Sequence, residues 1–158
     1  MSSLVIEVNG KKFAVSAPPA APLLYVLRNQ FGLHGPRFGC GLAQCGACTV
    51  MLGDQPIRSC VTPVAGAVGK PITTLEGLGT PEKPHPLQTA FIQEQAAQCG
   101  FCTNGMIMAS ASFFKLGFLH AHSTEEEIKS AMQPWLWRCG THFRIVAAIQ
   151  SAAKKMAP

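Results

Sequence analysis

The chain has 158 residues, of which 47% are hydrophobic and 13% are charged, and its formal net charge is +5. This composition provides core material for one domain or two small ones and is unlike that of a disordered chain. The basic residues are scattered, which argues against a nucleic-acid-binding surface, and no apolar run is long enough to span a membrane.

The first half of the chain predicts a small β-rich unit. Strands are expected over residues 4–10, 11–16, 48–53, 54–61 and 71–78, and a helix over residues 17–33. The first two strands meet at Asn9-Gly10, a strong hairpin signal, and the next two turn at Gly53-Asp54. Two hairpins and one helix indicate a mixed sheet that packs on the helix.

The second half predicts helices. The stretch GTPEKPHP, residues 79–86, is a proline-rich break, so we place a domain boundary between 1–78 and 79–158. Apolar residues at helical spacing then predict four helices, over residues 86–98, 105–119, 123–132 and 141–156. The third carries a capping-box signature at Ser123 or Thr124. The predicted fold class is therefore α+β.

Seven cysteines are many for a chain whose opening residues, MSSLVIEVNG, do not predict a signal peptide. Three of them, Cys40, Cys45 and Cys48, lie in the motif FGCGLAQCGACTV, and Cys60 follows after eleven residues as the fourth member of the set. Four thiolates are what a [2Fe–2S] cluster needs, and the C-x4-C-x2-C spacing is the plant-type one. Zinc sites more commonly use two short-spaced pairs, so this set favours iron–sulfur.

The glycines of this motif fit the same interpretation. Gly39, Gly41 and Gly46 allow a tight loop, because glycine readily takes positive φ. Such a loop aims backbone N–H groups at the sulfurs, and those hydrogen bonds help to set the reduction potential.

The motifs GPRFGCGLAQCGACTVMLG, IRSCVTPVAG, ITTLEGL and QCGFCTNGMIM together resemble the small iron–sulfur subunit of the molybdenum hydroxylases, the xanthine dehydrogenase and aldehyde oxidase family. The chain is most similar to a bacterial branch that includes isoquinoline 1-oxidoreductase, nicotinate dehydrogenase and the aldehyde dehydrogenases of acetic acid bacteria. The resemblance covers nearly the whole chain. It implies an N-terminal β-grasp, ferredoxin-like domain and a C-terminal four-helix domain, each with one [2Fe–2S] cluster.

The resemblance also implies partners. A large catalytic subunit would carry molybdopterin cytosine dinucleotide, and Gln98 stands where the family's glutamine contacts the pterin. Electrons would leave through this subunit to a cytochrome c or, alternatively, a flavin subunit. The substrate class is an aldehyde or an N-heterocycle. Two locations stay open, the cytoplasm and, by way of a partner, the bacterial periplasm or membrane surface.

The second cluster of the family uses a C-x2-C pair and a C-x-C pair, each at the start of a helix. Cys99 and Cys102 match the first pair, but in LWRCGTH only Cys139 matches the second, and Trp137 occupies the other position. An indole offers no lone pair to iron. The fourth ligand could be His142, Asn104 or water, the cluster could be altered or absent, or Trp137 could be a recent mutation or a sequence error.

We therefore expect an electron-transfer subunit that is not catalytic alone, because no histidine has a plausible catalytic partner. Two other classes are weighed against it. A stand-alone [2Fe–2S] ferredoxin leaves Cys99, Cys102 and the helical half unexplained, and a zinc-dependent interaction module predicts a colourless protein.

Overall fold

The N-terminal half is built on a five-stranded mixed sheet. The computed structural model describes residues 4–156. The sheet order is β2-β1-β5-β3-β4, with β1 at Leu4–Val8, β2 at Lys11–Val15, β3 at Thr49–Leu52, β4 at Gln55–Arg58 and β5 at Pro71–Thr73. Both predicted hairpins are present, and β5 runs parallel to β1. Asn9 and Gly10 take left-handed φ values of 51° and 76°, as a tight hairpin turn requires.

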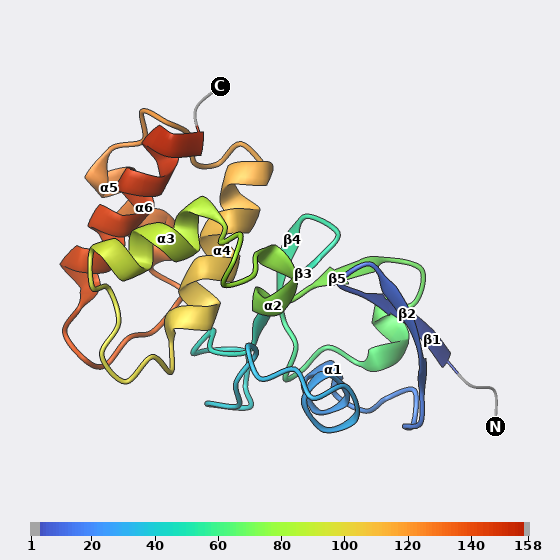
Figure 1. Ribbon diagram of the computed structural model, residues 1–158. Coiled ribbons are helices and arrows are strands. Elements are labelled where there is room, and N and C mark those ends of the chain that lie inside the picture. Colours follow the sequence, from blue (N-terminus) through green and yellow to red (C-terminus); the bar gives the residue numbers. More distant parts are fainter. Residues whose placement is uncertain (1–3, 157–158) are drawn as a thin grey trace.

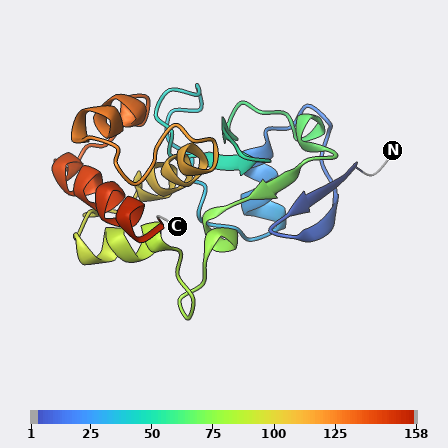
Figure 2. The same cartoon turned by 90° about the horizontal axis from the view of Figure 1, so that it is seen from above.

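One helical segment covers this sheet (Figures 1 and 2). It begins as α1 at Leu23–Tyr25 and continues as a π-helical stretch over Val26–Gln30. Leu23 and Leu27 are fully buried in a core that they share with the inward-facing residues of the strands. The α+β class and the sheet packed on one helix are confirmed.

The last predicted strand is shorter than expected. The sequence predicts an extended segment over residues 71–78, but β5 ends at Thr73 and Leu75–Leu78 form the short helix α2. Side chains stop the strand. The Asn9 carboxamide binds both the N–H group and the hydroxyl of Thr74, at 2.9 and 3.0 Å. The Thr74 hydroxyl also donates to Glu76, whose carboxylate is the acceptor for the N–H group of Gly35.

The C-terminal half contains the four predicted helices, α3 at Pro86–Gln93, α4 at Thr103–Lys115, α5 at Glu125–Met132 and α6 at His142–Met156. The capping box forms at Thr124, one of the two expected positions. The helix predicted to reach residue 98 ends at Gln93, and Gln95 takes a left-handed φ of 49°. None of the helices in the described part of the chain is long and apolar enough to cross a membrane.

The two halves pack on each other through α4 and β3, which lie side by side in both views (Figures 1 and 2). Met51 of β3 is fully buried within the core of the helical half. The hydroxyl of Ser112 on α4 donates to the carbonyl of Asp54 in the β3–β4 turn. The halves therefore meet directly beside the cysteine segments that precede β3 and α4.

Candidate metal centres

The first cysteine set lies in a loop whose N–H groups point at sulfur. The Sγ atom of Cys40 accepts three hydrogen bonds, each at 3.3 Å, from the N–H groups of Leu42, Gln44 and Cys45. The Sγ atom of Cys45 accepts one from Cys40 at 3.4 Å. Burial opposes ionisation of Cys40, but the N–H groups outweigh it and lower its pKa to about 7. The loop therefore favours a thiolate, the form that binds iron.

The glycines act in two different ways. Gly41 and Gly46 take left-handed φ values of 69° and 81°, as expected. Gly39 does not have a positive φ, so our explanation for that residue was wrong. A Cβ atom there would lie 2.7 Å from the Sγ atom of Cys45, and a side chain would therefore displace this sulfur.

Cys48 and Cys60 lie beneath the loop. They are 1% and 8% exposed and pack against Leu24. Antiparallel pairing of Thr49 with Arg58 brings the segments that carry these two thiols together. Burial raises the pKa of Cys48 to about 11. A bound metal would offset this cost, because a coordinating thiol is deprotonated outright.

An arginine lies within electrostatic reach of the whole set. Burial lowers the pKa of Arg58, and the thiols of Cys48, Cys45, Cys60 and Cys40 oppose that shift. The Arg58 side chain donates to the carbonyl of Ala43 at 3.2 Å, inside the cysteine loop. This cation was not identified from the sequence. Its position two residues before Cys60 was the available signal.

The second set gathers three thiols from two loops. Cys102 is the N-cap residue of α4, Cys99 precedes it, and Cys139 lies just before α6. The Sγ atoms of Cys139 and Cys99 are 3.3 Å apart. Burial, and then the neighbouring thiols, raise the pKa of Cys102, whereas hydrogen bonds from Phe101 and Cys139 lower that of the exposed Cys99.

Trp137 stacks on a histidine beside this set. Its ring centroid is 3.8 Å from that of His142, and the two planes differ by 8°. The charged neighbours of His142 are Lys129 and Glu125 on α5, and burial lowers its pKa. The Nε2 atom of His142 is buried without a hydrogen-bond partner in the described residues.

Asn104, the other candidate for a fourth ligand, turns toward the first loop. Its side-chain NH₂ group donates to the carbonyls of Ala47 and Thr49, each at 3.1 Å, on either side of Cys48. The sequence provided no account of this residue. The structure shows a buried bridge from the start of α4, where Cys102 lies, to the first cysteine set.

Trp135 is a second bridge between the halves. Its indole N–H donates to the Thr49 hydroxyl at 2.8 Å. A Cβ atom at Gly46 would clash with the indole, so this glycine makes room for the ring, whereas a Cβ atom at Gly105 on α4 would clash with the backbone carbonyl of Gly46. The next residue, Leu136, donates its N–H to the carbonyl of Cys45 at 3.0 Å. The segment that leads to Cys139 is thus anchored on the first cysteine loop.

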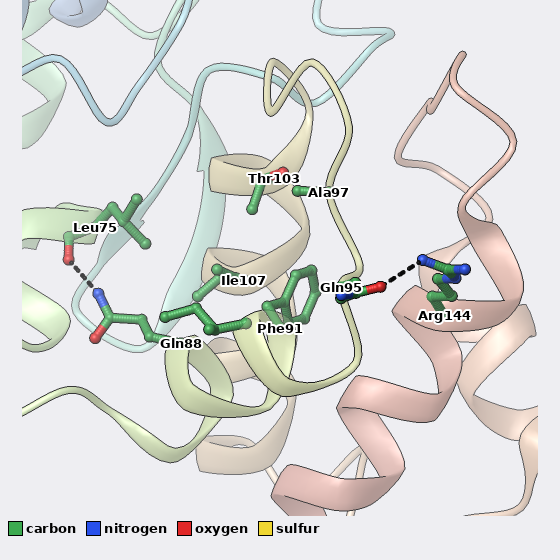
Figure 3. A pocket seen from close by; sticks show the side chains of 9 residues that line it. Leu75, Gln88, Phe91, Gln95, Ala97, Thr103, Ile107 and Arg144 are labelled. Carbon is green, nitrogen blue, oxygen red and sulfur yellow. Dashed lines mark hydrogen bonds between the residues drawn. The ribbon is translucent and has the colours of Figure 1, made fainter.

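Gln98 lies in the loop between α3 and α4 and is exposed, although a helical position was expected. The preceding residue, Ala97, lines an open pocket of about 570 Å³ together with residues of α2, α3, α4 and α6 (Figure 3). Phe91 and Ile107 form its apolar floor, and Arg144 donates to Gln95 at 3.3 Å across one side. The hydroxyl of Thr103 is buried there without a hydrogen-bond partner in the described residues.

The donor set at the first centre fits a [2Fe–2S] cluster. It offers four thiols, N–H groups aimed at sulfur, and a glycine whose Cβ would collide with a ligand. In residues 4–156, no three His, Cys, Asp or Glu side chains converge on one metal-ion position. A [2Fe–2S] cluster needs only two thiolates at each iron. The second centre offers Cys99 and Cys139, whose Sγ atoms are 3.3 Å apart, and Cys102 at the start of α4, while Trp137 stands at the position where the resemblance places a fourth thiol.

Known proteins show the same two-part organisation. A family model described as a 2Fe-2S iron-sulfur cluster binding domain matches residues 6–67, and one described as a [2Fe-2S] binding domain matches residues 74–150. One subunit of nicotinate dehydrogenase from Pseudomonas putida is 49% identical, over 97% of this chain and 96% of the relative. The alpha subunit of isoquinoline 1-oxidoreductase from Brevundimonas diminuta is 44% identical, over 95% and 97%.

Two solved structures share the fold. A chain of quinoline 2-oxidoreductase from Pseudomonas putida superposes with a TM-score of 0.88 at 34% identity, covering 96% of this chain and 93% of that chain. Aldehyde oxidoreductase from Desulfovibrio gigas gives a TM-score of 0.89 at 38% identity, covering 97% of this chain but 17% of that longer one.

Two cysteine-bearing domains of these kinds define an iron–sulfur electron-transfer protein. The chain belongs to the small [2Fe–2S] subunits of the molybdenum hydroxylase family. The resemblance is thereby confirmed, and with it the role of an electron-transfer subunit of a molybdenum-dependent dehydrogenase. In aldehyde oxidoreductase from Megalodesulfovibrio gigas the matching segment is 17% of a longer chain, whereas in nicotinate dehydrogenase from Pseudomonas putida it is nearly the whole of a separate subunit.

Proposed function

We propose that this chain receives electrons from molybdopterin cytosine dinucleotide in its large partner and passes them on through two [2Fe–2S] clusters. Cys40, Cys45, Cys48 and Cys60 hold the first cluster. Cys99, Cys102 and Cys139 supply three ligands of the second. The observation that supports this path is the pair of bridges from Asn104 and Trp135, which join the segments beside the second thiol set to the segment that carries Cys48.

The reaction in the partner releases two electrons, which is the number that two [2Fe–2S] clusters can accept. Hydroxylation with oxygen from water replaces a C–H bond by a C–O bond and releases two protons and two electrons. Each [2Fe–2S] cluster stores one electron, so the electrons leave one at a time. We infer an N-heterocycle or an aldehyde as the substrate, since relatives are named for nicotinate, isoquinoline and aldehyde oxidation.

The face that carries Gln98 and the pocket beside it is the proposed contact with the large subunit. The pocket lining is mostly apolar, and the Thr103 hydroxyl in it lacks a partner in the described residues. Burial of this face would shield a pterin that Gln98 contacts. Electrons would leave from the first centre toward a cytochrome c or flavin acceptor. The domain boundary at residues 78 and 79 remains a prediction of the same scheme.

The test is metal and sulfide analysis of the purified complex with visible and EPR spectra. Two full clusters predict about four iron atoms per chain, and loss of the second predicts about two. Co-purification with a larger molybdenum-containing chain would distinguish a subunit from a stand-alone ferredoxin. Zinc without iron would refute the proposal in favour of a zinc-binding module.

A further inference from the structure

Each cysteine set has one arginine bonded into its loop. Arg58 donates through Nε to the carbonyl of Ala43, between Cys40 and Cys45, at 3.2 Å. Arg37 donates through Nη1 to the carbonyl of Gly100, between Cys99 and Cys102, at 2.8 Å. Both arginines come from the N-terminal half, so the cation at the second centre is supplied across the domain contact.

Arg58 is held in place on several sides. Its Nη1 atom donates to the Thr49 hydroxyl and its Nη2 atom to the carbonyl of Pro134, both at 2.9 Å. The guanidinium lies 4.1 Å from the ring centroid of Trp135. All three acceptors are neutral, and an indole face lies against the cation. This arrangement fixes the charge without neutralising it.

Arg37 has a looser setting of the same kind. It is half-buried, and its guanidinium carbon lies 5.5 Å from the ring centroid of Phe101. Among residues 4–156, the ion pairs are Lys115 with Asp54 and Lys129 with Glu125. Neither arginine thus has a carboxylate partner in the described part of the chain.

We propose that Arg58 and Arg37 are the counter-charges of the first and second clusters and raise the reduction potentials of these clusters. The inference rests on the ligands proposed above. A thiolate-bound [2Fe–2S] cluster is anionic and gains one more negative charge on reduction. A fixed cation stabilises the reduced state more than the oxidised one, most strongly where water is excluded.

The two arginines differ in the size of the expected effect. Arg58 is held by three hydrogen bonds and a ring, whereas one hydrogen bond holds Arg37 near the exposed Cys99. The first cluster therefore gains more from its cation than the second does. Such a difference draws electrons from the second centre to the first, the direction in which they leave the complex.

EPR-monitored redox titration of the intact complex tests the proposal with Arg58→Gln, Arg37→Gln and Arg58→Lys. Removal of an opposite charge within about 4–6 Å changes an ionisation equilibrium tenfold or more. We therefore expect Arg58→Gln to weaken reduction of the first cluster about tenfold, a fall of about 59 mV for one electron. In Arg58→Lys, which keeps the charge, the potential of the first cluster should fall by less.

Arg37→Gln is the matched variant at the other centre. It should lower the potential of the second cluster and leave that of the first nearly unchanged, while Arg58→Gln does the reverse. If the parent shows one cluster only, the Arg37 measurement is made in the Trp137→Cys background. Lys11→Gln, an exposed charge loss on β2, controls for net charge and should move neither potential.

The proposal would be overturned if every variant shifted the reduction potentials of both clusters equally. It would also be overturned if the first cluster had the same potential in Arg58→Gln as in Lys11→Gln. If Arg58→Gln does not retain its first cluster, the test falls to Arg37→Gln. A second-cluster potential in Arg37→Gln equal to that of the parent would then contradict the proposed role of the arginines. Failure of the proposed ligation is distinguishable, since it appears as missing iron in the parent, before any potential is compared.

Discussion

The two cysteine sets differ in how much of each site the chain builds alone. The first lies within residues 39–60, buries Cys48 and Cys60, and directs four N–H groups at its sulfurs. The second joins loops 40 residues apart, leaves Cys99 exposed, and has three thiols. The comparison teaches that the first centre is preorganised by its own loop. The second centre depends on the packing of the two halves and on the proposed contact with the large subunit.

Loss of a buried ligand is the most severe test of this difference. Cys48→Ser should remove the first cluster and lower the iron content by about two atoms per chain, because a serine hydroxyl is a poor iron ligand. The matched variant Cys102→Ser should remove the second cluster and leave the first intact. Iron analysis and EPR measure both. Loss of both signals in either variant would contradict two independently held centres.

Trp137→Cys tests the incomplete ligand set. A thiol at this position would complete the pattern of four ligands, and we expect the second cluster signal in EPR to appear or strengthen. The first signal should not change. Trp137→Phe is the control, since it keeps an aromatic ring on His142 and adds no thiol. A Trp137→Cys variant with the iron content and spectrum of the parent would end the idea of a defective set.

Trp135→Ala tests the packing on which the second centre depends. Trp135 is 6% exposed, and its ring meets that of Phe113 edge-on at 5.4 Å. Removing it leaves a cavity and takes one hydrogen bond from the Thr49 hydroxyl, which keeps its bonds to Arg58 and Gly46. We expect a loss of about 3–5 kcal/mol in the free energy of unfolding, mostly from the cavity. Denaturant titration measures this loss.

Leu136→Ala is the control for that variant. Leu136 is 58% exposed, and its hydrogen bond to Cys45 uses the backbone N–H, which alanine keeps. We expect a change within about 0.5 kcal/mol. If the two variants lost equal stability, the packing of the Trp135 indole on Gly46 would not explain how the halves are held.

What the sequence predicted well was local. The hairpin at Asn9-Gly10 and the first cysteine loop follow from turn chemistry and ligand spacing within a few residues. The end of β5 was missed because it depends on Asn9, 65 residues from Thr74. Trp135 reads as one more apolar residue until its Thr49 contact, 86 residues away, is seen. Arg37 lies next to one cysteine set in the sequence and donates a hydrogen bond to the loop of the other, which no linear pattern reveals.

Asn104 provides the finest test of the link between the centres. It is 2% exposed, and its two donated hydrogen bonds hold the carbonyls on either side of Cys48. Asn104→Ala removes one hydrogen bond from each of these carbonyls, of which that of Ala47 keeps the bond from the Arg37 N–H group, and a lost buried hydrogen bond costs about 1–3 kcal/mol. The same change removes a buried Oδ1 atom that has no partner in the described residues, which offsets part of the cost.

We therefore expect Asn104→Ala to lower the free energy of unfolding by about 1–2 kcal/mol, less than Trp135→Ala. Because the lost bonds flank a ligand of the first cluster, iron release to a chelator should also become faster from that cluster than from the second. Ser110→Ala, which removes a hydroxyl bonded within α4 itself, is the control and should leave both release rates unchanged. Faster release from the second cluster alone would show that Asn104 serves the centre on its own helix and does not bridge the two.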